Sequence, residues 1–218
     1  MVRIAAGPVM LEGDLSLPHG TYGIVLFAHG SGSSRHSPRN RYVARLLNDA
    51  NLATLLVDLL TSDEEAIDAR TAHLRFDIGL LAERLTAITD WLTQQPDTRD
   101  LRIGYFGAST GAAGALVAAA ERSETVGAVV SRGGRPDLAG PALPRVRAPT
   151  LLIVGGNDFQ VIELNRAAFA QLRCKKQLVI VPGATHLFEE PGALDEVARL
   201  ARDWFERHLT QEHERVST

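Results

Sequence analysis

The chain alternates short apolar runs of strand length with longer amphipathic runs at helical spacing. Strands that are apolar along their whole length, and that are separated by helices, predict a parallel sheet covered by helices on both faces. Six runs are expected to form this sheet: GIVLFAH (23–29), ATLLVDLL (53–60), LRIGYFG (101–107), VGAVVS (126–131), TLLIVGG (150–156) and QLVIVPG (177–183). The N-terminal segments VRIAAG and VMLEGDLSL alternate polar with apolar residues and predict an antiparallel edge.

The amphipathic runs predict helices between and after these strands. The expected helices cover residues 40–51, about 72–95, 112–123, 161–172 and 193–209. Pro96 helps to end the second of them. A Gly- and Pro-rich excursion occupies residues 132–149. We expect a single domain over residues 1–210 and a flexible tail over residues 211–218.

Composition limits the class of protein. Hydrophobic residues make up 45 % of the chain and charged residues 22 %, which is ordinary for a soluble globular protein. The net charge is -3 and no dense Lys/Arg run occurs, so neither a nucleic-acid partner nor a membrane partner is expected. No apolar run approaches the ~20 residues that span a bilayer, and the start of the chain lacks an apolar signal core. We therefore expect a cytoplasmic protein. The sequence leaves the oligomeric state open, with a homodimer as one alternative.

The ends of the expected strands carry the residues that bear on function. In open α/β sheets, ligands bind at the carboxyl ends of the strands. HGSGS (29–33) follows the first buried strand and Ser109 follows the third. Asp158 and His186 follow the last two strands. A serine, an aspartate and a histidine are thus expected to meet at one edge of the sheet.

The segment GASTG (107–111) matches G-x-S-x-G at an expected strand-to-helix junction. A sharp turn there lifts the Ser109 hydroxyl above the sheet, and flanking glycines allow the strained backbone that this turn requires. The simpler interpretation is a serine that caps a helix after a glycine turn. The strand–turn–helix context and the later aspartate and histidine favour a nucleophile.

His186 is the expected base, because an imidazole that titrates near neutrality can take the serine proton and return it to a leaving group. Asp158 is the expected partner that fixes the imidazole tautomer. Asp137 and Asp58 also follow strands and remain rivals for this role. The other histidines that we considered lack such placement and are expected to be structural or surface residues; they are His19, His36, His73, His208 and His213.

A negatively charged tetrahedral intermediate needs hydrogen-bond donors placed in advance. The backbone N–H groups of Thr110 and Ser31 are the expected donors, with Gly32 as an alternative to Ser31. Gly30 and Gly32 are also candidates for substrate binding. Arg132, or Arg135, could clamp a substrate carboxylate through two hydrogen bonds, although a solvated loop arginine is the simpler interpretation. The same role in binding a substrate carboxylate is less strongly indicated for Arg35, His36 and Arg39.

Together, HGSGS (29–33), GASTG (107–111), GGND (155–158) and GATH (183–186) resemble the α/β-hydrolase superfamily, and within it the small dienelactone hydrolase-like proteins. The resemblance covers nearly the whole chain. It implies the α/β-hydrolase fold, with a mostly parallel eight-stranded sheet and flanking helices, Ser109 as nucleophile, Asp158 as acid and His186 as base. Dienelactone hydrolases proper use cysteine where this chain has serine.

The serine favours a carboxylesterase that cleaves small esters through an acyl-enzyme intermediate, with an ester and water as its partners. Residues 132–148 are too few for a cap domain, so we expect an open site. Lactone or thioester hydrolysis and a non-catalytic binding module of the same fold remain alternatives. A nucleotide-binding oxidoreductase is disfavoured because Arg35 stands where G-x-G-x-x-G needs its third glycine. No cofactor is expected, and the scattered histidines do not suggest a metal site.

Overall fold

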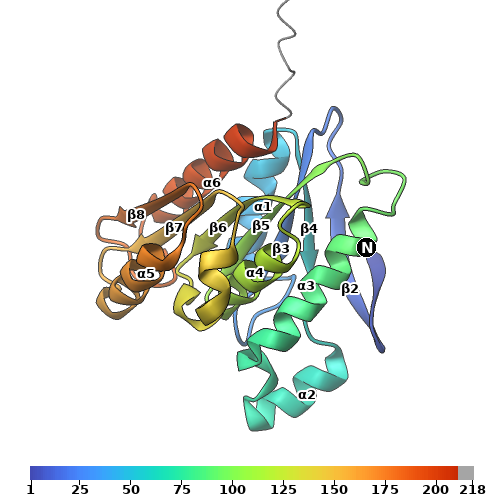
Figure 1. Cartoon of the computed structure of the whole chain (residues 1–218), viewed down its shortest axis with the longest axis horizontal. Coiled ribbons are helices and arrows are strands. Elements are labelled where there is room, and N and C mark those ends of the chain that lie inside the picture. The colour runs from blue at the N-terminus through green and yellow to red at the C-terminus, as the bar shows by residue number, and fades with distance from the viewer. Residues whose placement is uncertain (211–218) are drawn as a thin grey trace, which may run out of the picture.

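The computed structural model describes residues 1–210 and contains one eight-stranded sheet with helices on both faces (Figure 1). The strand order is β1-β2-β4-β3-β5-β6-β7-β8. The strands are Val2–Ala6 (β1), Val9–Ser16 (β2), Gly23–Ala28 (β3), Leu52–Val57 (β4), Arg102–Ala108 (β5), Val126–Arg132 (β6), Thr150–Gly155 (β7) and Lys176–Val181 (β8). The predicted mostly parallel sheet with an antiparallel edge is confirmed, since β3 to β8 pair in parallel and β1 and β2 pair antiparallel. The tail predicted at 211–218 lies outside the described residues.

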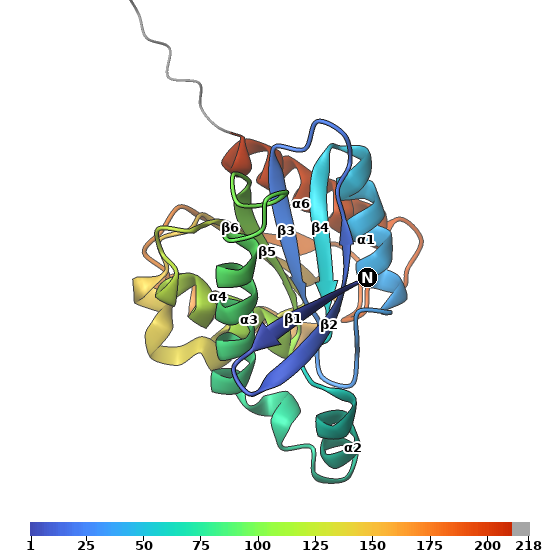
Figure 2. The ribbon, with the colours of Figure 1, turned by 90° about the vertical axis from the view of Figure 1, so that its right-hand side faces the viewer.

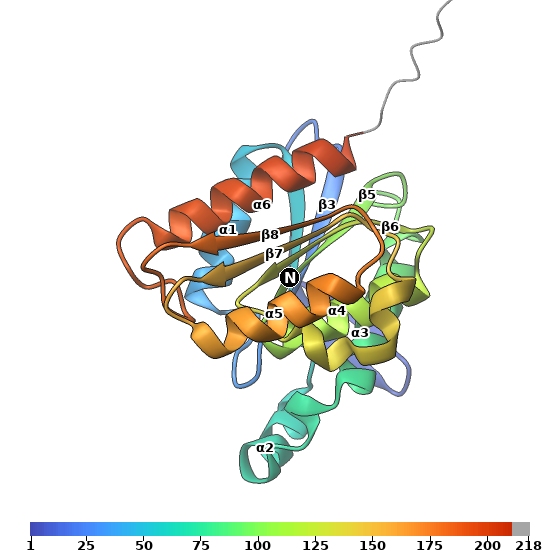
Figure 3. The ribbon, with the colours of Figure 1, turned by 60° about the vertical axis from the view of Figure 1, so that its left-hand side comes forward.

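Two groups of helices enclose the sheet. α1 (Pro38–Asp49) and α6 (Ala193–Leu209) cover one face. α3 (Ile78–Leu92), α4 (Thr110–Glu121) and α5 (Phe159–Gln171) lie on the other face (Figure 3). Each layer exists because the strands are apolar on both sides, as in the fully buried β3 and β7.

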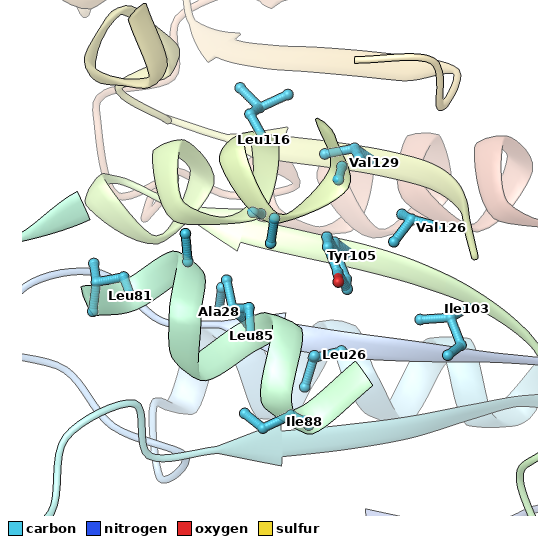
Figure 4. Close-up of a cluster of buried hydrophobic side chains, with 14 of the residues drawn as sticks. Leu26, Ala28, Leu81, Leu85, Ile88, Ile103, Tyr105, Leu116, Val126 and Val129 are labelled. Carbon is cyan, nitrogen blue, oxygen red and sulfur yellow. The ribbon is translucent and has the colours of Figure 1, made fainter. Parts of the chain in front are cut away.

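The central strand β5 is held from both faces. On one side, the Phe106 ring packs in a tilted arrangement against Phe27 of β3, with ring centroids 4.9 Å apart, beneath α1 and α6. On the other side, Tyr105 lies in a buried cluster with Leu85 of α3 and Leu116 of α4 (Figure 4). Rigid packing of β5 fixes the position of the turn that follows it.

The segment between β4 and α3 differs from the prediction of one helix over residues 72–95. A separate helix α2 (Ser62–Thr71) and a 3₁₀ turn η1 (Leu74–Phe76) precede α3 and project from the body of the molecule (Figure 2). Thr61 and Glu64 form a reciprocal capping box that starts α2. Ala72 ends α2 in the left-handed conformation, and the Asp77 carboxylate caps α3 by accepting the Leu80 N–H.

The Gly- and Pro-rich excursion after β6 forms a 3₁₀ segment, η2 (Pro136–Arg145), which packs against α4 and α5. Pro141, Pro144 and the positive φ of Gly140 (46°) prevent a regular helix there. The expectation of no large cap domain is confirmed. Within residues 1–210, no helix is long and apolar enough to cross a membrane.

Candidate active site

Ser109 forms a strained turn between β5 and α4. Its φ and ψ are 50° and -125°, a conformation that non-glycine residues rarely adopt. Its side chain makes no capping hydrogen bond to α4, although it occupies the N-cap position. The helix-cap interpretation therefore does not describe this serine. A strain of about 1–3 kcal/mol at such a residue is typical of functional sites rather than of ordinary turns.

Glycines around the turn allow three segments of backbone to approach one another. A Cβ on Gly111 would lie 2.3 Å from the carbonyl oxygen of Ala28, and one on Gly107 would lie 2.4 Å from the Cα of Ala112. A Cβ on Gly30 would lie 2.9 Å from the Cβ of Ser109. Any side chain at these positions would displace the turn. The glycines thus bring the HGSGS loop against the base of the Ser109 side chain.

Asp158 and His186 form a hydrogen-bonded pair at the ends of β7 and β8. The Nδ1–H of His186 donates to Oδ2 of Asp158 over 2.6 Å. The aspartate side chain is 15 % exposed and the imidazole 41 % exposed, so the carboxylate is shielded while the ring reaches solvent. Gly133 packs beneath the ring, where a Cβ would lie 3.5 Å from Nδ1. With Nδ1 held in this way, Nε2 is the nitrogen left to accept a proton.

The strand register brings this pair to the same edge of the sheet as Ser109. Ala108, the residue before the serine, pairs with Arg132 of β6, and Gly155 of β7 pairs with Val181 of β8. Within residues 1–210, neither Ser109 Oγ nor His186 Nε2 has a hydrogen-bond partner. The direct serine–histidine bond is therefore not formed in this structure. Such bonds are often long in free enzymes and tighten when substrate binds.

The two rival aspartates are occupied elsewhere. Asp58 accepts the backbone N–H of Arg35 over 2.6 Å and also pairs with the Arg35 guanidinium. Asp137 receives two hydrogen bonds from Arg135, of 2.9 and 2.8 Å. Neither carboxylate contacts His186. The same pairing removes Arg135 as a free clamp for substrate.

His29 anchors the HGSGS loop, which the sequence analysis did not anticipate. Its Nε2 accepts the N–H of Leu59 over 3.0 Å, and its Nδ1–H donates to the carbonyl of Gly30 over 2.9 Å. Burial lowers the pKa of His29, so the ring is neutral at pH 7 as this pattern requires. The signal available in the sequence was only its position at the end of an apolar strand.

Ser31 and Thr110 lie next to each other, with their hydroxyl oxygens 3.4 Å apart. The loop after β3 and the first turn of α4 therefore meet beside Ser109. They line a cavity of about 550 Å³ together with Gly30, Gly32 and the first turn of α1. Residues of α2 and Arg75 also line this cavity. Ser109 and His186 are not among the lining residues, so the cavity adjoins the nucleophile through Ser31 and Thr110.

Arg132 is not a solvated loop residue. It is 6 % exposed, and its guanidinium donates to Oδ1 of Asn40 in the first turn of α1 over 3.2 Å. Its backbone carbonyl accepts the N–H of Ser109 over 3.4 Å. Arg132 is therefore buried behind the site, where its guanidinium does not clamp a substrate directly.

Comparison with known proteins places this architecture in a family. The family model described as "Dienelactone hydrolase family" matches residues 41–211. The chain belongs to the dienelactone hydrolase family. The crystal structure of a dienelactone hydrolase from Anabaena variabilis ATCC 29413 is similar to it, with a TM-score of 0.94, 67 % sequence identity, and coverage of 95 % of this chain and 96 % of that chain.

Other relatives carry different names. A Mycobacterium tuberculosis protein, whose name proposes a phosphoribosyl transferase, is 62 % identical over 95 % of this chain and 46 % of its own length. The chain thus spans about half the length of such curated relatives. Est1E from Butyrivibrio proteoclasticus shares the fold at a TM-score of 0.78 and 17 % identity, over 94 % of this chain and 97 % of that chain. The matching family model and the similar structure from Anabaena variabilis both carry the name of a hydrolase, which supports a hydrolase.

Proposed function

We propose that this member of the dienelactone hydrolase family is a serine hydrolase that cleaves small carboxylic esters through an acyl-enzyme on Ser109. One observation carries the proposal: a strained, uncapped serine stands at the sheet edge that also holds the Asp158–His186 pair. A serine hydroxyl is a weak nucleophile and needs such a base. Cysteine is the nucleophile expected of dienelactone hydrolases proper, so the serine favours esters over dienelactone itself.

The proposed mechanism has two stages. Ser109 Oγ attacks the ester carbonyl while His186 Nε2 takes the hydroxyl proton, and the same proton passes to the departing alcohol. Water, deprotonated by His186, then attacks the acyl-enzyme, and His186 returns this proton to Ser109 Oγ as the acid leaves. Asp158 stabilises the imidazolium that forms in each stage. The N–H groups of Thr110 and Ser31 are the proposed donors to the oxyanion, a role in which one lost donor costs ~100-fold or more in kcat.

Substitution of the nucleophile tests the proposal across substrate classes. A panel of p-nitrophenyl esters, a simple lactone and a thioester is to be assayed with wild type and Ser109→Ala. We expect ester hydrolysis by wild type and a loss of about 10⁴-fold or more in kcat for the variant. Circular dichroism checks that the variant is folded. If Ser109→Ala keeps wild-type turnover, the proposed mechanism is wrong, and a preference for lactone or thioester would move the substrate class to the alternative.

The phosphoribosyl transferase named for the longer relatives is not proposed for this chain. That name belongs to proteins about twice as long, whereas the family model that matches this chain describes hydrolases.

A further inference from the structure

Arg132 is a buried cation without a carboxylate partner. Its only side-chain hydrogen bond within residues 1–210 goes to the neutral amide oxygen of Asn40, and its Nε is buried with no partner. Burial, and secondarily the charge of Arg39, lower the pKa of Arg132 to about 10, so it stays protonated at pH 7. Buried charges are normally paired, because an isolated one loses its hydration without compensation.

Arg39 lies beside it and is only weakly paired. Its Nε is also buried without a partner, and its ion pair is a 3.3 Å contact with Glu189, whose side chain is 65 % exposed. Arg39 lines the 550 Å³ cavity, as do Ser37 and Thr110. One wall of the cavity therefore combines the Arg39 guanidinium with the N-terminus of α1, which adds partial positive charge, while Arg132 lies buried behind this wall on Asn40 and does not line the cavity.

The acidic residues that line the cavity, Glu65 and Asp68, both belong to α2. Asp68 is saturated by Arg75, which donates through its side chain and its backbone, and by the N–H of Leu74. Glu65 is an exposed residue of α2. Neither carboxylate contacts Arg39 or Arg132, so within residues 1–210 the contact with Glu189 is the only ion pair that either arginine makes. Two positive charges facing one weak partner favour a dianion as the missing counterpart.

We propose that the substrate ester carries a phosphate monoester group, and that Arg39 binds this group at the α1 wall with Arg132 behind it. This inference rests on the proposed esterase function and names its substrate class. Arg39 is the binding residue. Arg132 is a positioning residue that acts through Asn40 and through its charge. The hydroxyls of Ser31, Ser33 and Ser34, which line the same cavity, supply donors to phosphate oxygens.

The test compares esters that differ in one group. Acetylated glycerol 3-phosphate, glycerol acetate and acetylated glyceric acid supply a phosphate, a neutral group and a carboxylate on the alcohol side of the same acetate ester. We expect wild type to have the highest kcat/KM for the phosphorylated ester. Arg39→Met should lower the ratio of kcat/KM for phosphorylated over neutral ester by roughly ten- to a hundredfold, the range for a charged hydrogen bond. Arg39→Lys should retain part of this ratio, because lysine still supplies a point charge.

Arg132 and a control on the same helix sharpen the result. Arg132→Met should raise KM for the phosphorylated ester more than it lowers kcat. Arg132→Lys should restore the KM of the wild type. Arg41→Met removes an exposed charge from α1, outside the cavity lining, and should leave the ratio unchanged. Since Arg39 is partly exposed, its variants stay informative if Arg132→Met does not fold.

Three results would overturn the inference while leaving the esterase intact: no preference for the phosphorylated ester, equal preference for the carboxylate ester, or equal effects of Arg39→Met and Arg41→Met. Binding of inorganic phosphate to Ser109→Ala, measured by calorimetry, separates the two proposals. If phosphate binds and Arg39→Met abolishes the binding while no ester is cleaved, the anion site stands and the proposed function fails.

Discussion

Asp158→Asn is expected to lower kcat for ester hydrolysis by about 10⁴-fold while the protein stays folded. An asparagine keeps the size of the side chain but cannot accept the Nδ1–H with a negative charge, so it favours the wrong imidazole tautomer and leaves the imidazolium without a counterion. Folding should survive because the Asp158 side chain makes no capping bond to α5. Steady-state kinetics on a p-nitrophenyl ester, with circular dichroism in parallel, measures both effects.

The chain supplies two matched controls for this substitution. Asp58→Asn and Asp137→Asn remove carboxylates that pair with Arg35 and Arg135 instead of His186. Both variants should keep kcat close to wild type, even where the loss of an ion pair lowers the melting temperature. A large loss of kcat in either control, with Asp158→Asn active, would show that the acid follows another strand and is not Asp158.

Gly111→Ala is expected to destabilise the protein by about 3 kcal/mol, because the added methyl would collide with backbone that has no room to move. Its Cβ would stand 2.3 Å from the carbonyl oxygen of Ala28 and 2.4 Å from that of His29. For a chain of this length the loss corresponds to a fall of about 6–12 °C in Tm. Activity should fall as well, since the same contact sets the HGSGS loop against Ser109. Thermal denaturation and ester kinetics provide the two measurements.

Gly79→Ala is the matched control. Gly79 is an exposed residue in the first turn of α3, and a Cβ there meets only a side-chain oxygen of Asp77 at 3.4 Å. Alanine in a helix is favoured over glycine by about 0.5–1 kcal/mol, so this variant should be as stable as wild type or more so. Equal destabilisation by the two substitutions would show that close backbone approach at Gly111 is not the cause.

The sheet was predictable because each of its parallel strands is a continuous apolar run, and the order of the residues behind those runs predicted one functional edge. The segment from Ser62 to Phe76 was not predictable in this way. Helical spacing of apolar residues finds helices that face a core, whereas α2 has a single buried residue, Asp68. The Thr61–Glu64 capping box and the Asp77 cap were the local signals that mark the two helix starts.

The positions of some side chains of the site could likewise be predicted from the sequence, whereas those of others could not. Ser109, Asp158 and His186 each lie in the turn or loop that follows a strand, so the strand order brings them to one edge. Arg132 follows a strand too, but its burial depends on α1, whose Asn40 lies 92 positions away in the chain. No local pattern carries such a contact. The choice among three aspartates likewise required knowledge of which arginines occupy the other two.

Covalent labelling tests most directly whether Ser109 is the activated nucleophile that we propose. Wild type, His186→Ala and Ser109→Ala are to be treated with a fluorophosphonate and measured by intact-mass spectrometry, followed by peptide mapping. We expect one adduct per wild-type chain, located on Ser109, slow labelling of His186→Ala and none of Ser109→Ala. A folded wild-type protein that stays unlabelled, or that is labelled at another residue, would contradict the claim.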